Sequence, residues 1–328
     1  MSDRNFGGRR QAYLAGSVFV AAGLLSGAAH ATSILFVGNS FTYGEPAGGA
    51  PIVENYQPST VTDLNGSHIG GVPALFKQLT VEAGLNFNVS LETVPGVGLD
   101  YHYNNKLPLL TTQPYDIAIL QGYSTLDPAH PGDPTNQIIY SNKLAQALDQ
   151  QNPATRVLLD ATWSRADQTY LPTGHWYGQP ISAMYQAVQQ GDVRADNASD
   201  LVNGVIPVGA AFNQAIQSGL ADANPYDGID PGKINIWAPD SYHASPYGYY
   251  LEALTEFYSV TGENPTMFGA NDPLAAAIGI TSTQAALLQG FAAANPELLP
   301  EPASLMAVGS GLLGLLWSRR RPSKKPSA

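Results

Sequence analysis

Short runs of consecutive apolar residues alternate along the chain with longer segments in which apolar residues recur every three or four positions. The runs are typical of strands buried on both faces, and the longer segments are typical of helices that cover a sheet. The expected strands span Ser33–Val37, Asn86–Val94, Tyr115–Leu120, Arg156–Asp160 and Gly204–Val208. The expected helices span Val72–Glu82, Asn142–Asp149, Ala210–Ser218 and Ser245–Val260. This order predicts an α/β fold, a three-layer α/β/α sandwich with a central parallel sheet.

Polar stretches rich in glycine and proline separate these elements. They cover Glu45–Gly71, Tyr123–Thr135, Trp163–Pro180 and Ala221–Lys233. Ligands of open α/β sheets bind at the carboxyl ends of the strands, where long loops shape the site. Tyr123, Trp163 and Trp237 lie in or beside these loops, and we expect them to bind substrate by stacking on a sugar ring. The alternative is that each ring only packs against the protein.

Charge is distributed unevenly along the chain. The first ten and the last ten residues hold eight of the 15 lysine and arginine residues. Residues 32–302 hold seven basic and 25 acidic residues, a net charge of −18. A surface this acidic repels phosphate backbones, so we expect no nucleic-acid partner. The absence of cysteine excludes disulfides, cysteine nucleophiles and cysteine-ligated zinc.

Both ends of the chain have the pattern of sorting signals. Residues 1–31 have a basic start, an apolar run and the sequence Ala29-His30-Ala31, which predicts a signal peptide that the secretion machinery cleaves after Ala31. Residues 299–328 contain Pro300-Glu301-Pro302, then 15 uncharged residues from 303 to 317, then a basic cluster at 319–321.

This C-terminal order resembles the PEP-CTERM sorting tail of Gram-negative bacteria. The resemblance implies processing by an exosortase-type enzyme and transient anchoring of the tail in the membrane. It also implies a final location in the cell envelope or the extracellular matrix. The alternative is a plain C-terminal membrane anchor, although 15 uncharged residues are short for a stable span.

A serine at the end of the first strand is the candidate nucleophile. Gly38-Asn39-Ser40 follows the apolar run directly. Many hydrolases hold a nucleophile on such a strand end, although the same residue types also form ordinary turns. Asp240 precedes His243 by three residues in a loop just before the last predicted helix. This spacing lets the carboxylate reach Nδ1 of the imidazole and leaves Nε2 for the serine.

Taken together, these segments resemble the SGNH (GDSL-like) hydrolase family. Gly38-Asn39-Ser40 matches the first block of the family, with Asn39 in place of the usual aspartate. Asp240-Ser241-Tyr242-His243 matches the last block. The resemblance implies the flavodoxin-like SGNH hydrolase fold for residues 32–298. It also implies that Ser40 is the nucleophile, His243 the base and Asp240 the carboxylate that orients the base.

The resemblance further implies an oxyanion hole. Its donors are the backbone N–H of Ser40, a backbone N–H in the second block, and an asparagine side chain in the third block. The second block offers Gly96, with Gly98 as the second choice, although both glycines are also explained by a turn. The third-block asparagine is missing here, and Ser124 stands in its place, with Gln121 as the other candidate donor. Loss of one donor lowers the rate by about 10²–10³ if nothing replaces it.

These residues predict a secreted serine esterase that removes acyl groups, acetyl above all, from carbohydrate or exopolysaccharide. One alternative is a lipase or thioesterase with a longer acyl pocket. Another is a non-catalytic envelope or matrix protein that binds carbohydrate on the same fold, which the missing third-block asparagine motivates.

No cofactor is expected, and no metal site. His102 lies close to Asp100, and His130 lies close to Asp127 and Asp133. Such loop pairs are usually solvated side chains when no second cluster of ligands converges on them.

Overall fold

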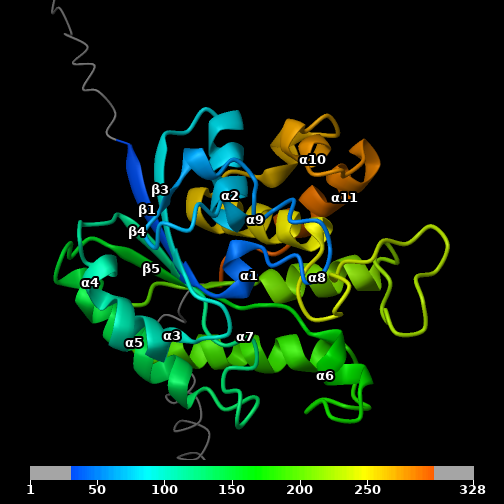
Figure 1. The fold of residues 1–328 in the computed structure, drawn as a ribbon, viewed down its shortest axis with the longest axis horizontal. Coiled ribbons are helices and arrows are strands. Elements are labelled where there is room, and N and C mark those ends of the chain that lie inside the picture. The colour runs from blue at the N-terminus through cyan, green and yellow to red at the C-terminus, as the bar shows by residue number, and fades with distance from the viewer. Residues whose placement is uncertain (1–30, 299–328) are drawn as a thin grey trace, which may run out of the picture. The chain divides into compact units, whose positions relative to one another are not determined.

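The computed structural model describes residues 31–298, and a six-stranded parallel sheet lies at its centre. The strand order is β2-β3-β1-β4-β5-β6. Figure 1 labels β3, β1, β4 and β5, which follow one another in this order. The strands are β1 (Thr32–Gly38), β2 (Thr62–Asp63), β3 (Phe87–Thr93), β4 (Ile117–Leu120), β5 (Arg156–Asp160) and β6 (Val205–Ile206). β1 pairs with both β3 and β4, so its carboxyl end lies in the interior of the sheet with a strand on each side.

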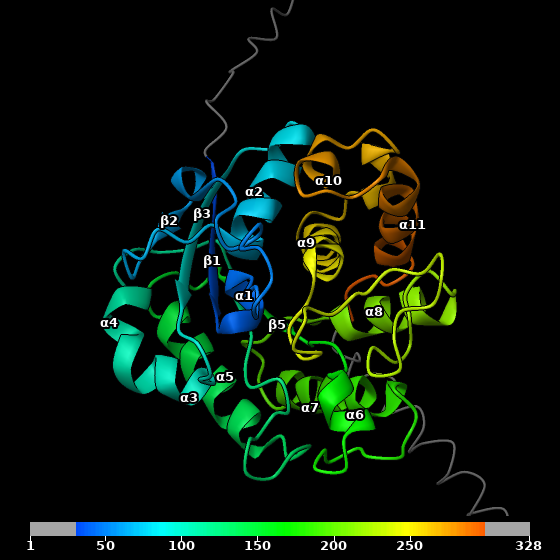
Figure 2. The same ribbon diagram turned by 45° about the vertical axis from the view of Figure 1, so that its right-hand side comes forward.

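Alternate side chains of each strand enter two different hydrophobic cores. Ile34 and Phe36 pack into one core, and Leu35 and Val37 pack into the other. The first core is covered by α2 (Gly71–Glu82), α8 (Val208–Gln217), α9 (Pro246–Thr261) and α11 (Ser282–Ala293). The second is covered by α3 (Leu99–Tyr101), α4 (Leu107–Leu110), α5 (Thr135–Asp149) and α7 (Ser182–Asn197). Figure 2 shows these two helical layers on either side of the sheet, which confirms the predicted three-layer sandwich.

The structure differs from the sequence expectations at several elements. β6 is only two residues long, because α8 already begins at Val208. α7 was not expected, because buried Asp192 and Asp196 interrupt its apolar stripe. The expected helix from Asn142 is the second half of α5, which already begins at Thr135. The remaining short elements are α1 (Ser40–Tyr43), η1 (Pro58–Thr60), the π-helical η2 (His102–Lys106), α6 (Ala166–Tyr170), η3 (Pro265–Phe268) and α10 (Pro273–Ala277).

The predicted sorting segments fall almost entirely outside the described residues. The expected signal peptide covers residues 1–31 and the expected tail covers residues 299–328, including the apolar stretch 303–317. Within residues 31–298, no helix has the length and apolar character needed to cross a membrane.

Candidate active site

Ser40 lies at the carboxyl end of β1, where the chain turns sharply into α1. Asn39 caps this short helix, and its Oδ1 accepts a hydrogen bond from the backbone N–H of Phe41 at 3.1 Å. The turn is packed so closely that a Cβ atom on Gly38 would lie 2.1 Å from Thr42 Oγ1 and 2.9 Å from Gln121 Oε1. A glycine is therefore required directly before the Asn-Ser pair.

The three residues of the predicted catalytic set lie in a hydrogen-bonded series. Ser40 Oγ lies 2.9 Å from His243 Nε2. On the other side of the ring, His243 Nδ1 lies 2.6 Å from Asp240 Oδ2. Ser40 and His243 come from opposite ends of the described chain, and the fold brings them to one point above the sheet. Their arrangement is that of a nucleophile, a base and an orienting carboxylate.

The Asp240 carboxylate is held in its ionised form. Burial raises the pKa of Asp240, but three hydrogen bonds oppose that effect. They come from His243 Nδ1 and from the backbone N–H groups of Tyr242 and His243, and together they bring the pKa below its usual value. A charged Asp240 then favours the tautomer of His243 in which Nδ1 carries the proton and Nε2 is free to accept one.

The loop that carries Asp240 and His243 has an unfavourable backbone conformation at Ser241. Its φ is +58°, in the left-handed region, where a residue other than glycine is strained by about 1 kcal/mol or more. The start of α6 holds the loop in this shape, because the backbone N–H groups of Ala166 and Asp167 donate to the Ser241 carbonyl at 3.1 and 3.3 Å. The position of His243 thus depends on the segment after β5.

Asn39 also connects the serine turn to two neighbouring loops. Its Nδ2 donates to the carbonyl oxygens of Val97 at 2.9 Å and of Gly122 at 3.0 Å. Val97 belongs to the loop after β3, and Gly122 to the loop after β4. The Asn39 side chain therefore holds together the three strand ends around Ser40.

Gln121 is engaged in the same network rather than facing the site. Its Oε1 accepts hydrogen bonds from the Asn39 backbone N–H at 2.9 Å and from Thr42 Oγ1 at 3.2 Å. Its Nε2 donates to the Gly122 carbonyl, and the side chain is buried. These contacts hold the Gln121 amide in the turn network, and the role of Gln121 as an oxyanion donor stays a prediction.

The two glycines of the second block have different surroundings. Gly96 is exposed and follows Pro95 with a φ of +72°, the conformation that the third position of a type II turn requires. Gly98 is buried, and a Cβ there would lie 2.3 Å from the Tyr123 ring. The bond from Asn39 to the Val97 carbonyl also draws this part of the loop to the serine turn. The turn explains Gly96, whereas close packing explains Gly98.

Ser124 is contacted by an arginine that the sequence patterns did not single out. Arg165 Nη1 lies 3.3 Å from Ser124 Oγ. The guanidinium also lies 3.5 Å above the centre of the Tyr242 ring and pairs with Asp167 through two hydrogen bonds of 2.9 and 2.6 Å. Arg165 thereby joins the third block to the loop of His243. Its position after a strand and its neighbouring aspartate were the only signals available in the sequence.

Two of the three predicted stacking aromatics lie in the interior. Trp163 is 0% exposed and stacks between Phe41 and Phe212, with ring centres 4.2 and 4.6 Å away. Trp237 is 1% exposed, and its Nε1 donates to the Ser164 carbonyl at 3.0 Å. Neither ring is free to stack on a sugar, so that expectation is wrong for both. Trp163 instead donates to the Tyr242 carbonyl at 3.1 Å and so supports the His243 loop.

Tyr123 is partly buried beside the second-block loop. Burial raises its pKa, and the nearby Asp100 carboxylate raises it further. The phenol is therefore neutral at physiological pH and remains a candidate for contact with substrate.

A polar pocket of about 420 Å³ lies next to Arg165. It is lined by Thr125, Pro128, Pro131, Arg165, Gln168, Thr173 and His175. Since Arg165 contacts both Ser124 and Tyr242, this pocket adjoins the residues around the Ser40–His243 pair.

The histidines considered as metal ligands do not form such a site with the neighbours named above. His102 is buried, and its Nδ1 pairs with Glu92 Oε2 at 2.5 Å. His130 is largely exposed and lies 3.7 Å from Asp127. Within residues 31–298, a different group of carboxylates, formed by Asp160, Glu252 and Glu256, lies close enough together to hold an ion.

Comparison with known proteins identifies the C-terminal tail and gives structures with a similar fold. The family model of the PEP-CTERM protein-sorting motif matches residues 299–321, which confirms the predicted tail and indicates an exported protein. No curated protein matches the sequence. The fold is similar to that of a DUF4886 family protein from Bacteroides uniformis, with a TM-score of 0.55 at 17% identity over 80% of this chain and 94% of that one.

Two further solved structures have lower similarity. One is described as an SGNH hydrolase from Slackia heliotrinireducens, with a TM-score of 0.47 at 18% identity over 70% of this chain and 99% of that one. The other is an acetyl xylan esterase from Geobacillus stearothermophilus, with a TM-score of 0.41 at 14% identity over 76% and 95%. The six-stranded parallel sheet with helices on both sides agrees with the predicted three-layer α/β/α fold.

Proposed function

We propose that this protein is a serine ester hydrolase. The observation that carries the proposal is the continuous series from Ser40 Oγ through His243 to Asp240, with distances of 2.9 and 2.6 Å. In the proposed reaction, His243 Nε2 takes the proton of Ser40 as Oγ attacks the ester carbonyl. The imidazolium then gives that proton to the leaving alcohol. His243 next activates a water molecule, which releases the acid from the acyl-enzyme.

Ser124 is the proposed side-chain donor to the oxyanion. Arg165 donates into a lone pair of Ser124 Oγ, so the hydroxyl hydrogen of Ser124 is free to point at another acceptor. The neighbouring guanidinium charge also makes this hydroxyl a better donor. Backbone N–H groups of Ser40 and of the second block complete the proposed hole. The proposed second-block donor is Gly96, with Gly98 as the second candidate, and the Asn39–Val97 bond draws the loop that carries both to the serine turn.

The proposed substrate is an acyl ester of a carbohydrate, with acetyl as the acyl group. The polar pocket beside Arg165 supports a hydroxyl-rich alcohol, because its threonine, glutamine and histidine side chains offer hydrogen bonds to a sugar. The sorting tail supports a substrate in the cell envelope or extracellular matrix of a Gram-negative bacterium, reached after exosortase-type processing. The ordered Ser40–His243–Asp240 geometry favours this hypothesis over a non-catalytic binding protein.

Labelling with a fluorophosphonate probe tests the proposal. The probe reacts with activated serines, so we expect one adduct per chain, located on Ser40 by mass spectrometry, and none in Ser40→Ala. Hydrolysis of p-nitrophenyl acetate should fall by at least about 10³-fold in Ser40→Ala. Hydrolysis of the octanoate ester should be slower than that of the acetate. Unchanged hydrolysis in Ser40→Ala would refute the mechanism, and faster hydrolysis of octanoate would favour a lipase.

A further inference from the structure

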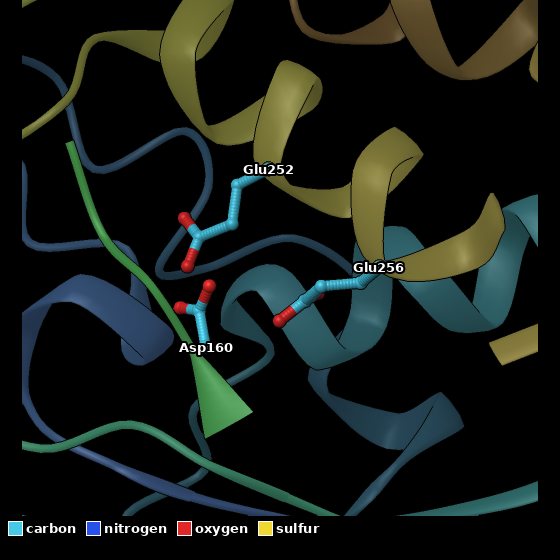
Figure 3. A group of neighbouring side chains, drawn as sticks. All are labelled: Asp160, Glu252 and Glu256. Carbon is cyan, nitrogen blue, oxygen red and sulfur yellow. The ribbon is translucent and has the colours of Figure 1, made fainter. Parts of the chain in front are cut away.

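Three carboxylic acids converge in the interior between the sheet and α9. Asp160 is the last residue of β5, and Glu252 and Glu256 lie one turn apart on α9. Figure 3 shows the Glu252 and Glu256 side chains directed from the helix toward Asp160, and Asp160 directed back at them. One oxygen from each lies within 4.8 Å of the others. All three side chains are buried, with at most 3% exposure.

These carboxylates lack the partners that buried acids normally have. Both oxygens of Asp160, both of Glu252 and Oε2 of Glu256 have no hydrogen-bond donor. None of the ion pairs found among residues 31–298 involves any of the three. Asp192 provides the contrast, because this equally buried carboxylate accepts a hydrogen bond from Gln137 Nε2 at 2.6 Å.

Asp160 faces the two glutamates of α9 from a separate element. It is fully buried and directs two unpartnered oxygens at them. Unpaired ionised groups are very unfavourable in the interior, so the cluster must be neutralised by protons or by a cation.

The three acids converge on one point, as the ligands of a cation do. Three protons could also pair these oxygens, because each O–H···O bond satisfies two of them, so the experiment below separates protons from a cation. Calcium binds carboxylate oxygens at about 2.3–2.6 Å, so two ligand oxygens on opposite sides of one ion are separated by about 4.6–5.2 Å. Oxygens that all lie within 4.8 Å of one another fit around a single ion of this kind. A strand and a long helix hold the ligands, which gives the site a rigid frame.

We propose that Asp160, Glu252 and Glu256 bind one divalent, oxygen-preferring cation of the calcium class, which joins β5 to α9. The ester mechanism does not require this ion. Its role is structural, because α9 directly follows the His243 loop, and β5 leads to the segment that holds Ser241. A site this buried takes up its ion as the chain folds.

Refolding with and without metal tests the site. The full chain is unfolded in denaturant with EDTA, then refolded in metal-free buffer or in 1 mM Ca²⁺, Mg²⁺ or Mn²⁺ as separate arms. Tm is measured in each arm, and metal content is measured after gel filtration. We expect about one ion per chain in at least one arm, and a rise in Tm of about 5 °C or more there.

Two variants distinguish the loss of the metal site from the general effect of removing one carboxylate charge. Glu256→Gln keeps the size of the side chain and removes its charge, so it should lose both the bound ion and the rise in Tm. Glu82→Gln is the matched control, because Glu82 is a half-buried helical glutamate bonded to Gln78 and lies outside the cluster. Glu82→Gln should still bind the ion and still show the rise in Tm with metal.

The proposal is overturned if the unaltered protein binds none of the three ions and its Tm is the same in every arm. It is also overturned if Glu256→Gln raises Tm by the same amount with and without metal, because protons would then neutralise the cluster. Metal content of the unaltered protein decides the question even if Glu256→Gln does not fold.

Discussion

The side-chain amide of Asn39 donates a hydrogen bond to the carbonyl oxygen of Gly122 at 3.0 Å. This contact ties the serine turn at the end of β1 to the end of the neighbouring strand β4. A second hydrogen bond from the same nitrogen, to the Val97 carbonyl, adds the loop after β3. The strand ends that surround Ser40 are therefore joined by one side chain next to the candidate nucleophile.

Removing this side chain should misplace the nucleophile without unfolding the protein. We expect Asn39→Ala to lower kcat by about 10²-fold, because small displacements of reacting groups have effects of this size. Asn105→Ala is the control, since the Asn105 amide is exposed and bonds only within its own turn. Rates on p-nitrophenyl acetate and Tm should be measured together. A loss of Tm that accounts for the loss of rate would argue against a positioning role.

Asp240→Asn should impair the base without moving it. The amide has no negative charge with which to stabilise the imidazolium, and it favours the wrong tautomer of His243. We expect kcat to fall by about 10²–10⁴-fold, and the rate of fluorophosphonate labelling of Ser40 to fall with it. Asp230→Asn is the matched control, because Asp230 is an exposed loop carboxylate paired with Lys233. Equal activity of the two variants would contradict the assigned role of Asp240.

Arg165 and Ser124 should act as a unit. Ser124→Ala removes the proposed oxyanion donor and should lower kcat by about 10²-fold, with little change in KM. Arg165→Ala should lower kcat in the unaltered background and less in Ser124→Ala, because part of its effect passes through that hydroxyl and the rest through Tyr242 in the His243 loop. Arg194→Ala, on the exposed side of α7, is the control. Fully additive losses in the double-mutant cycle would show that the two residues act separately.

Asp196 should make stability depend on pH in a defined direction. This carboxyl is 3% exposed, and burial raises its pKa to about 6, although a backbone hydrogen bond from Gly204 opposes the shift. A raised folded-state pKa means that the protonated form is favoured on folding. The stability from this group is therefore full below its unfolded pKa of about 4 and is lost as the pH rises through 6.

Asp196→Asn should consequently stabilise the protein at pH 8 and not at pH 4. We expect a gain of about 1–3 kcal/mol at pH 8, or a rise in Tm of roughly 3–8 °C. Asp200→Asn, at an exposed position nearby in sequence, should have little effect at either pH. Thermal unfolding of both variants at the two pH values is the measurement. An equal gain at pH 4 and pH 8 would contradict the assignment.

The sequence predicted an element best where a single effect, such as burial of apolar side chains, determines its structure. The strand at Arg156–Asp160 was predicted with its observed bounds, because a run of apolar residues buried on both faces has few alternatives. α7 was not predicted, because its buried face includes Asp192 and Asp196. Those carboxyls are tolerated through contacts from other elements, such as Gln137 on α5, that local patterns do not contain.

The same limit explains the errors at the candidate site. Trp163 and Trp237 stand in loop-like sequence, and only the packing around them shows that their rings fill the interior. Gln121 is a plausible oxyanion donor by position, and only the fold shows that its amide also bonds to Asn39, Thr42 and Gly122. Where a side chain points, and which hydrogen bonds it makes, depend on the folded structure around it.

By itself, the sequence determined the parallel α/β sandwich, the sorting tail, and the residue types and spacing of Ser40, Asp240 and His243. Hydrophobic periodicity and short motifs are local, so they are present before the chain folds. The tertiary structure decided that Ser40 Oγ lies 2.9 Å from His243 Nε2, that Arg165 contacts Ser124, and that Asp160 of β5 meets the two glutamates of α9. These contacts join residues far apart in the chain, and their distances depend on how strands and helices pack together.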